Sequence, residues 1–380
     1  MKKMLMVASV PSMIGQFNMN NIRLLLELKY DVDVACNFND HSVWSKEKIV
    51  QLKDNLAALN VNTYQIDFER SMFKVSNHIR SYKQMKKLMN ERKYNLIHTH
   101  TPISSLITRI AFKNSQIFNK CRIIYTAHGF HFFEGNNPLK NFLFRNIERY
   151  GARYTDTLIT INKEDYEAAK KFKLRKNGMV EYVPGVGIDI DKIDSIQGNK
   201  EELCKELNIP VDSILLLSVG ELNNNKNHKA VIECLPELPN NIHYIICGMG
   251  PLREQYDELA RKLRVIDRLH LLGYRNDAIK IMKASDIFIF PSKREGLSVA
   301  LMEAMACGLP CIVSNIRGNT DLVQKQPYIH LCNPDNSKDF FKEIINIDTN
   351  KQKEIYLFNT NNAKQYDVKK IDKKMKHIYQ

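Results

Sequence analysis

Two glutamates eight positions apart are the first residues in this 380-residue chain that could do chemistry. The segment 294–310 reads REGLSVALMEAMACGLP, with Glu295 ahead of an apolar run and Glu303 inside it. Nearly every neighbour of Glu303 is apolar or small, so a carboxylate there needs polar partners. A solvent-facing glutamate would suit a more polar helix than this one. The pair therefore points to a ligand rich in hydroxyl groups.

The residues between the two glutamates predict a helix whose first turn could face the same ligand. Ser298 can begin a helix that Gly308 ends, with Pro310 just beyond it. The backbone N–H groups of Gly296, Leu297 and Ser298 precede the first helical hydrogen bonds, so they suit a phosphate or sugar oxygen.

Two more polar residues follow apolar runs that are typical of β-strands. Lys226 lies in ELNNNKNH after ILLLSVG, where its charge and a helix N-terminus could hold an anion together. His128 follows RIIYTA and precedes a glycine. The alternatives are a solvated turn lysine and a loop histidine that bonds to backbone. Ligands of parallel α/β sheets bind beyond the carboxyl ends of the strands, so both residues are candidates.

Other motifs argue against a dinucleotide, a P-loop or a metal. ICGMGPL places a G-x-G after a strand, yet it lacks the third glycine and carries Pro251. No Walker lysine motif is present, and the eight scattered cysteines form no C-x-x-C pair. Asp189 and Asp191 mimic a D-x-D metal motif, but they follow PGVG and are expected to cap a helix. We therefore predict no metal and no cofactor.

Strand-like runs alternate with amphipathic stretches through the whole chain. Runs that are apolar at most positions, such as KMLMVAS, HYIICG and IFIFPS, indicate parallel strands covered on both faces. The pattern predicts an α/β fold of two Rossmann-like, doubly wound domains, residues 1–183 and 184–360, which face each other across a cleft. A basic helix-like segment, residues 361–380, follows them.

The net charge of +14 belongs to the first domain. Residues 1–180 carry the whole excess, and residues 181–380 are balanced. The first half is therefore expected to meet an anionic partner. Within it, residues 70–93 interleave basic and apolar side chains. Such a pattern suits a sheet-covering helix with a solvated basic face, or a helix that lies on an anionic membrane.

The order of these motifs resembles one known family. An E-x7-E pattern after the fourth strand of a second Rossmann-like domain is the mark of the retaining, nucleotide-sugar-dependent glycosyltransferases of family 4, which have the GT-B fold. The resemblance covers nearly the whole chain, through YTAHGFHFFEG, YTDTLITINKEDY, VEYVPGVGID, LSVGELNNNKNH, ICGMGPL, LLGYRND and FPSKREGLSVALMEAMACGLP. These segments are similar to a bacterial capsule and exopolysaccharide branch of that family.

The resemblance implies a role for each candidate residue. Glu295 would bind hydroxyls of the donor sugar, aided by the backbone amides that follow it, and Glu303 would bind the ribose. Lys226 would bind the diphosphate and stabilise the departing nucleotide. His128 would lie near the reacting centre of the donor, so His128 and Glu295 are the predicted catalytic residues. Gly15, expected in the loop after the first strand, would let backbone approach the ligand.

One position departs from the pattern of the family. The family often has an arginine beside the phosphate where this chain has Glu221, in VGELNNNK. A carboxylate would repel a diphosphate, so either Glu221 turns away or another cation substitutes for the arginine. Arg275 and Arg294 are the candidates.

The resemblance also implies the reaction and its place. A sugar would move with retention from a nucleotide diphosphate sugar, most often a UDP-sugar, to a lipid-linked saccharide acceptor in bacterial surface polysaccharide synthesis. The enzyme would be of hexosyltransferase type. Segment 361–380 would pack back onto the first, acceptor-binding domain. Because no run approaches the roughly 18 apolar residues of a membrane span, we expect a cytoplasmic protein, held peripherally at the anionic inner face of the membrane.

Three other classes compete with this interpretation. A nucleotide-sugar epimerase of the same fold would reuse the cleft, although the E-x7-E loop favours transfer. An NAD-dependent dehydrogenase needs a complete G-x-G-x-x-G, which is absent. A nucleic-acid-binding protein could use the charge of +14, but no helix-turn-helix, zinc or stacking motif accompanies it, and no nucleic-acid partner is predicted.

Overall fold

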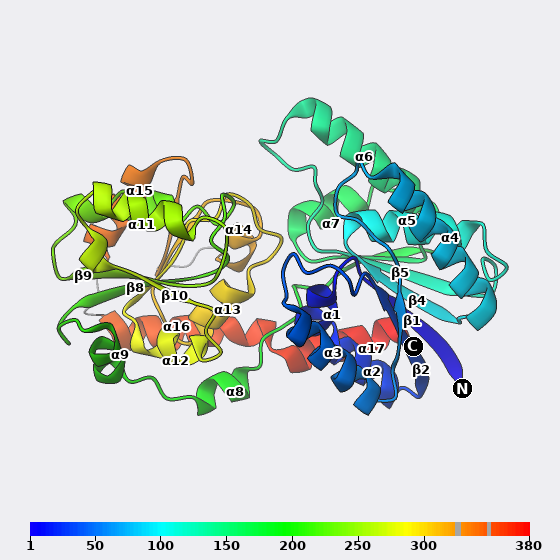
Figure 1. Cartoon of the computed structure of the whole chain (residues 1–380), viewed down its shortest axis with the longest axis horizontal. Coiled ribbons are helices and arrows are strands. Elements are labelled where there is room, and N and C mark those ends of the chain that lie inside the picture. Colours follow the sequence, from blue (N-terminus) through cyan, green and yellow to red (C-terminus); the bar gives the residue numbers. More distant parts are fainter. Residues whose placement is uncertain (324–327, 348–350) are drawn as a thin grey trace. The chain divides into compact units, whose positions relative to one another are not determined.

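The computed structural model describes residues 1–323, 328–347 and 351–380, and these form two compact units (Figure 1). Unit 1 comprises Met1–Val186 with Ile371–Gln380, and unit 2 comprises Gly187–Lys370. The first boundary lies a few residues after the position, 183, that the sequence suggested. The returning segment is shorter than expected, because it begins at Ile371 rather than at residue 361.

Unit 1 is built on a seven-stranded sheet in the order β3-β2-β1-β4-β5-β6-β7, and every pairing is parallel. The order reverses between β1 and β4, which is the topological switch point of a doubly wound sheet. Its strands are β1 (Lys2–Val7), β2 (Tyr30–Cys36), β3 (Asn62–Gln65), β4 (Leu96–His100), β5 (Arg122–Ala127), β6 (Thr157–Thr160) and β7 (Met179–Tyr182).

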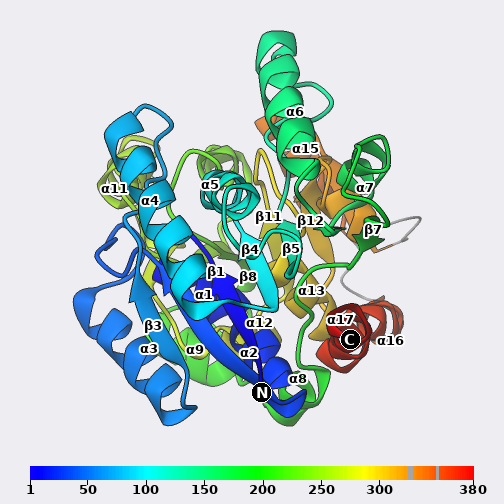
Figure 2. The same ribbon diagram turned by 90° about the vertical axis from the view of Figure 1, so that its right-hand side faces the viewer.

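Helices cover both faces of this sheet (Figures 1 and 2). Met4 and Met6 of β1 pack in one cluster with residues of the first three helices and of the last, while Leu5 and Val7 pack on the other face with residues of α4 and α5. Alternate residues of a strand point to opposite faces, so a run that is apolar throughout serves both layers. The helices are α1 (Pro11–Phe17), α2 (Met19–Glu27), α3 (Lys46–Ala58), α4 (Val75–Arg92), α5 (Pro102–Lys113), α6 (Pro138–Ala152) and α7 (Lys163–Ala169).

The last helix, α17 (Val368–Tyr379), carries the chain from unit 2 back into unit 1. Ile371, Met375 and Ile378 lie in the same cluster as the first strand. The hydroxyl of Tyr379 contacts Nδ1 of His98 at 2.8 Å, inside unit 1. The predicted return of the C-terminal helix to the first domain is therefore present, through apolar packing and one buried polar contact.

Unit 2 repeats the plan with six parallel strands in the order β10-β9-β8-β11-β12-β13. Its switch point lies between β8 and β11. The strands are β8 (Ile214–Val219), β9 (Ile242–Cys247), β10 (Leu269–Gly273), β11 (Ile287–Phe290), β12 (Cys311–Ser314) and β13 (Ile329–Cys332). The helices are α8 (Ile190–Ser195), α9 (Lys200–Leu207), α10 (Lys229–Ile232), α11 (Arg253–Lys262), α12 (Ala278–Ala284), α13 (Val299–Ala306), α14 (Asn319–Leu322), α15 (Ser337–Asn346) and α16 (Gln352–Ala363).

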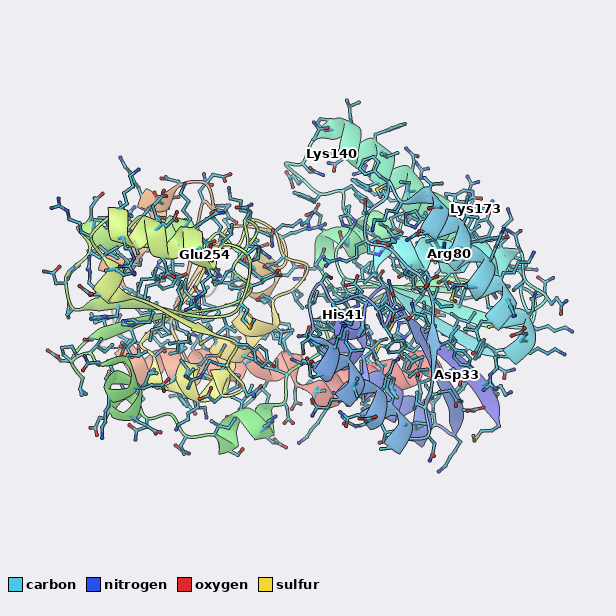
Figure 3. All side chains as sticks on the ribbon, in the orientation of Figure 1. Asp33, His41, Arg80, Lys140, Lys173 and Glu254 are labelled. Atoms are coloured by element: carbon cyan, nitrogen blue, oxygen red, sulfur yellow. The ribbon has the colours of Figure 1, made fainter. Side chains whose placement is uncertain are left out.

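Both predicted sheets are confirmed as parallel and doubly wound. Charged side chains cover the outside of each unit, among them Arg80 of α4 and Lys140 of α6 (Figure 3). None of the described helices is both long and apolar enough to pass through a bilayer.

Candidate active site

The switch point of unit 2 brings two predicted residues into direct contact. The loop after β8 carries Lys226, and the loop after β11 carries Glu295. The Nζ atom of Lys226 donates a hydrogen bond to Oε1 of Glu295 at 2.8 Å, and both side chains are largely buried. The adjacency of β8 and β11 in the sheet explains how residues 69 positions apart meet.

Neighbouring residues fix the position of the Lys226 ammonium at the end of β11. Its Nζ is 4.7 Å from the centre of the Phe290 ring, within the range of a cation–π contact. A Cβ atom on Gly220 would come within 3.2 Å of the methylene groups of Lys226, so a glycine there leaves room for the lysine stem. The positive charge is thus held at one point beyond the sheet.

Asparagines in the same loop join it to the loop that carries Glu295. The N–H of Lys293 donates to the carbonyl of Asn225 at 2.7 Å, and Nδ2 of Asn225 donates to the carbonyl of Arg294 at 2.9 Å. Nδ2 of Asn227 donates to the carbonyl of Pro291 at 3.1 Å. The asparagines of this loop therefore join it to the loop that carries Glu295.

The start of α13 offers backbone donors, as predicted. Ser298 is the N-cap, and its hydroxyl accepts a hydrogen bond from the N–H of Leu301 at 3.2 Å. Within the described ranges, the N–H groups of Gly296, Leu297 and Ser298 have no hydrogen-bond acceptor. Three consecutive donors next to a helix N-terminus and a lysine form an anion-binding arrangement.

Glu303 lies inside α13, mostly surrounded by buried residues such as Met302 and Ala304. Burial raises the pKa of the Glu303 carboxyl to about 7, and the ammonium of Lys192 on α8 lowers it by a smaller amount. The shift follows from the cost of burying a charge without a hydrogen-bond partner. Such a carboxyl is poised to gain from ligand hydroxyl groups.

Glu221, which replaces the arginine of the family, and its two candidate substitutes, Arg275 and Arg294, lie in different surroundings. Arg275 forms ion pairs with Asp277 at 2.7 Å and with Glu206, so its guanidinium is engaged with carboxylates. The side chains of Arg294 and Glu221 are exposed. Lys226 pairs with Glu295 and not with Glu221. Of the two candidate substitutes for the missing arginine, Arg294 is the one adjacent to the Lys226–Glu295 pair.

In unit 1, His128 lies at the end of β5 and contacts a second histidine. Its Nε2 is 3.0 Å from Nδ1 of His100, which ends the neighbouring strand β4. A third ring, His98, lies 4.1 Å from His100 between centres, and its Nε2 contacts Oγ1 of Thr126 at 2.8 Å. Burial lowers the pKa of His128 to about 4 and that of His98 to about 3, and it lowers the pKa of His100 well below the usual range. All three are neutral near pH 7.

The contacts indicate which nitrogen of His128 is available to a ligand. Nε2 of His100 is buried and has no partner among the described residues. Because orphaned buried N–H groups are rarer than under-used acceptors, we infer that His100 carries its proton on Nδ1 and donates it to Nε2 of His128. The proton of His128 then lies on Nδ1, which makes this side a hydrogen-bond donor.

Several residues of these sites were not singled out from the sequence. His100 is one, although NLIHTH places two histidines on one face of a strand that ends beside His128. The others are His228, Tyr244 and Ser218, which follow or pack near the Lys226 loop. Nδ1 of His228 contacts the Tyr244 hydroxyl at 3.0 Å, and this hydroxyl contacts that of Ser218 at 2.7 Å. These contacts depend on sheet pairing, which local patterns do not reveal.

The expected position of Gly15 was wrong. Gly15 lies within α1 and not in the loop after β1. A Cβ atom there would approach the Trp44 ring to 2.2 Å, so the glycine admits a tryptophan against the helix. Pro11 at the start of α1 explains the early helix, since proline is favoured in the first turn. The prediction for Asp189 was correct, because its side chain caps α8 at the N–H of Lys192.

Two family models match the chain, one in each unit. "Glycosyl transferase 4-like" matches residues 15–162, and "Glycosyl transferases group 1" matches residues 199–365.

Among proteins of known name, the putative glycosyltransferase EpsD of Bacillus subtilis is 29% identical, covering 85% of this chain and 81% of EpsD. The UDP-Gal:alpha-D-GlcNAc-diphosphoundecaprenol alpha-1,3-galactosyltransferase of Escherichia coli is 29% identical over 77% of each chain. The crystal structure of Anabaena Alr3699/HepE in complex with UDP and glucose superposes with a TM-score of 0.77 and 18% identity, covering 100% of this chain and 99% of that one.

The two doubly wound units have the GT-B fold. The chain belongs to the family 4 glycosyltransferases, so it is an enzyme that transfers glycosyl groups.

Proposed function

We propose that the enzyme transfers a hexosyl group, with retention of anomeric configuration, from a UDP-sugar to a lipid-linked saccharide in bacterial polysaccharide biosynthesis. The contact between Lys226 and Glu295, together with the N–H groups of residues 296–298 ahead of α13, carries the proposal. A cation, a carboxylate and N–H donors of this kind would complement the groups of a sugar diphosphate. The similarity to a galactosyltransferase that acts from UDP-Gal supports the choice of donor.

The proposed mechanism follows from where charge develops. Cleavage of the glycosyl–phosphate bond leaves negative charge on the diphosphate and positive charge on the sugar. Lys226 and the amides of residues 296–298 stabilise the diphosphate more strongly as that charge grows, which lowers the barrier. Glu295 accepts hydrogen bonds from hydroxyls of the donor sugar, and Glu303 accepts them from the ribose.

His128 acts as a neutral hydrogen-bond donor to the reacting sugar in this proposal. Its low pKa disfavours a general base that must hold a proton near pH 7. The departing diphosphate then takes the proton of the acceptor hydroxyl, which is consistent with front-face attack and retention. Arg294 is the proposed substitute for the family arginine, and Arg275 is the less favoured one because of its ion pairs.

The acceptor and the location are proposed from charge and from one relative. The galactosyltransferase of Escherichia coli acts on a diphosphoundecaprenol-linked sugar, and such an acceptor is held in a membrane. The positive excess of residues 1–180 would hold unit 1 at the anionic inner leaflet, where each basic residue contributes about 1 kcal/mol.

A ligand screen followed by product analysis tests the proposed reaction. Nucleoside diphosphates and their sugars are added to the protein, and a ligand present at a hundred times its Kd should raise the free energy of unfolding by about 2.7 kcal/mol. The accepted UDP-sugar is then used for transfer, and nuclear magnetic resonance reads the anomeric configuration of the first product. An inverted product would contradict retention. Stabilisation by other nucleotides but not by UDP would contradict the proposal that the donor is a UDP-sugar.

A further inference from the structure

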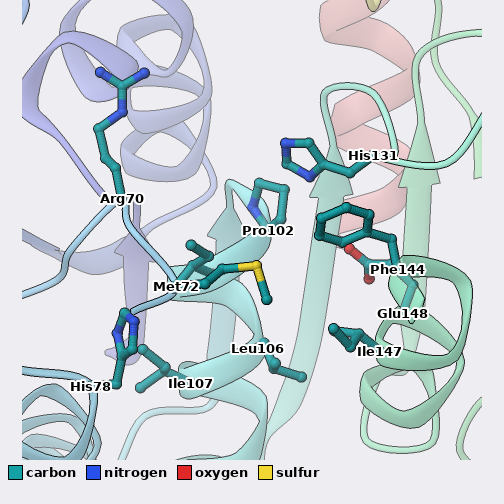
Figure 4. Close-up of a pocket in the computed structure, with 11 residues that line it drawn as sticks. Arg70, Met72, His78, Pro102, Leu106, Ile107, His131, Phe144, Ile147 and Glu148 are labelled. Atoms are coloured by element: carbon teal, nitrogen blue, oxygen red, sulfur yellow. The ribbon is translucent and has the colours of Figure 1, made fainter. Parts of the chain in front are cut away.

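Unit 1 contains an apolar pocket between α5, α6 and the loop before α4 (Figure 4). Its volume of about 310 Å³ would hold roughly ten water molecules at about 30 Å³ each. Its apolar lining comes from three segments, namely Met72, Ile103, Leu106, Ile107, Phe144 and Ile147. We call this cavity the α5–α6 pocket. Walls of this kind favour a hydrocarbon ligand over water.

A buried polar network fixes the two helices that form the pocket. Arg109 of α5 donates from Nη2 to Oε2 of Glu148 on α6 at 3.1 Å, and the Tyr125 hydroxyl donates to Oε1 of Glu148 at 3.0 Å. A Cβ atom on Gly151 would come within 2.6 Å of the Arg109 guanidinium, so this glycine lets the arginine pass. An apolar cavity tends to collapse when its walls can move. Here an ion pair between α5 and α6 and a hydrogen bond from Tyr125 of β5 fix the positions of the two helices.

Exposed apolar side chains precede the lining residues in two segments of the chain. On α6, a few residues before Phe144, Leu139 is 80% exposed and Phe142 is 73% exposed. In the loop before α4, next to Met72, Phe73 is 93% exposed. Figure 1 shows α6 extending beyond the other helices of the unit. Large apolar side chains gathered in this way mark a surface that is covered in use.

Basic side chains lie at the same surface. Arg70 lines the pocket, together with two histidines, His78 and His131, and Glu148. The exposed face of α6 carries Lys140 and Arg149, while its acidic residue, Glu148, is buried in the network. An occupant with complementary chemistry therefore joins a hydrocarbon chain to an anionic group.

We propose that the α5–α6 pocket binds the first isoprene units of a polyprenyl diphosphate carrier, with the diphosphate next to the basic side chains. The proposal rests on the proposed lipid-linked acceptor, and it assigns that acceptor's chain to a defined cavity. His131 follows His128 by three positions, and Pro102, which also lines the pocket, follows His100 by two. Two lining residues thus follow β4 and β5 within a few positions of the histidine pair, so an acceptor bound in the pocket would lie at the same end of these strands.

Photolabelling locates the occupant directly. The probe is geranylgeranyl diphosphate with a diazirine on its terminal isoprene unit, applied to the full-length protein. We expect the labelled residues to lie in segments 102–107 and 144–147, with unlabelled geranylgeranyl diphosphate as an effective competitor. Inorganic diphosphate and phosphatidylglycerol vesicles should compete weakly, because neither supplies a single chain joined to a diphosphate.

Variants that fill the pocket from opposite walls test the assignment. Leu106→Trp and Ile147→Trp should each lower the labelling yield about tenfold or more, since they remove the space for the chain. Val50→Ser, at an exposed apolar position of α3 that does not line the pocket, is the matched control and should leave the yield unchanged. A normal melting temperature and normal UDP binding show that each variant is folded. Labelling confined to residues 139–143, or unaffected by both filling variants, would overturn the proposal.

Failure of this proposal and failure of the proposed function give different results. If wild-type protein transfers sugar to a diphosphate lipid while the probe labels elsewhere, only the pocket assignment is wrong. If it transfers sugar to no lipid-linked acceptor, the proposed function is wrong. The filling variants should lose transfer to a long-chain polyprenyl acceptor and keep hydrolysis of the UDP-sugar in the absence of acceptor.

Discussion

At the scale of single residues, Glu303 links ligand binding to a proton. Its pKa of about 7 means that a large part of the carboxyl is protonated at neutral pH. Ribose hydroxyls donate best to the ionised form, so UDP binding should release a proton near pH 7 and should strengthen as the pH rises from 6 to 8. Calorimetry in buffers of different ionisation enthalpy measures this release. Glu303→Gln is the control, and an equal heat in all buffers for the wild-type protein would contradict the assignment.

A rise in pH, which should strengthen UDP binding, should lower the stability of the ligand-free protein through the same carboxyl. Its pKa in the folded protein lies above the ordinary value of 4.5, so the folded state binds more protons between these two values. Relative to Glu303→Gln, the free energy of unfolding of the ligand-free protein should therefore fall as the pH rises from about 4.5 to 7, by up to about 3 kcal/mol. Chemical denaturation at several pH values checks the slope, and a rise over this window would refute the burial argument.

Lys226 should matter in both the ground state and the transition state. Lys226→Ala removes the charge next to the diphosphate, so UDP affinity should fall by about 1–3 kcal/mol and turnover by about a hundredfold. Lys229→Ala is a matched control, because Lys229 is exposed in the helix that follows this loop and pairs with Glu233 at 3.5 Å. Steady-state kinetics and calorimetry on both variants give the comparison. Wild-type turnover in Lys226→Ala would exclude the proposed role.

His100 should act on turnover through His128. His100→Phe removes the partner of Nε2 on His128, so the ring loses its orientation and its fixed proton. We expect kcat to fall roughly 10–100-fold with UDP affinity unchanged, since the proposed UDP site lies in unit 2. His100→Asn, which retains a donor, should recover part of the loss. If His100→Phe turned over normally, the histidine pair would have no part in the reaction.

Gly15 offers a test between packing and ligand approach. Gly15→Ala places a methyl group against the Trp44 ring, and it should lower the free energy of unfolding by about 1–3 kcal/mol. Trp44→Leu in the same chain should relieve most of that loss, which a double-mutant cycle measures. A substitution that left stability intact but weakened binding of the donor would restore the role that the family resemblance implied.

At the scale of helices, α4 is less available to a membrane than its composition suggests. Arg80 pairs with Asp67 at 3.5 Å, Lys87 with Glu91 at 3.8 Å and Arg92 with Asp33 at 3.0 Å. Their charge is partly neutralised within the protein. The exposed basic and apolar face of α6 is a second candidate for the same contact, which the sequence pattern of residues 70–93 had not suggested.

Sedimentation with liposomes tests the membrane proposal. The protein should bind anionic vesicles and not neutral ones, and high salt should release it. Charge reversal of Lys83, Lys86 and Lys87 should weaken binding and leave UDP affinity intact. Reversal of Arg253, Arg261 and Lys262 on α11 of unit 2 is the control and should have little effect. Equal recovery of wild-type protein in both supernatants would end the peripheral-membrane proposal.

At the scale of the whole molecule, the central strands of both sheets and the edge strands β7 and β10 were predictable, and the other two edge strands were not. The central strands are apolar on both faces, so their runs identify them and their parallel packing. The edge strands β3, with the sequence NTYQ, and β13, with IHLC, were missed because each is short and only partly buried. The start of α17 also differs from expectation, since residues 364–367, which include a short 3-10 helix, separate it from α16, and only its later part enters unit 1.

In the candidate site, residues of a local motif were predictable, and residues that depend on contacts between distant segments were not. Glu295, Ser298 and Glu303 were found because they share one local motif, and Lys226 because it follows a strand. His100 was not found, since its contact with His128 arises from the pairing of β4 and β5. The position of Gly15 was wrong because Trp44, which determines the need for a glycine, lies in a distant segment.

Transfer of labelled sugar into lipid is the measurement that tests the central claim most directly. Wild-type protein, membranes that contain polyprenyl diphosphate saccharides and a panel of radiolabelled UDP-sugars are incubated together, and the lipid is extracted. We predict that one UDP-sugar gives label in the lipid fraction, and that Lys226→Ala lowers its rate about a hundredfold while Lys229→Ala does not. Absence of lipid label with every sugar donor, or equal labelling by wild-type protein and Lys226→Ala, would contradict the account.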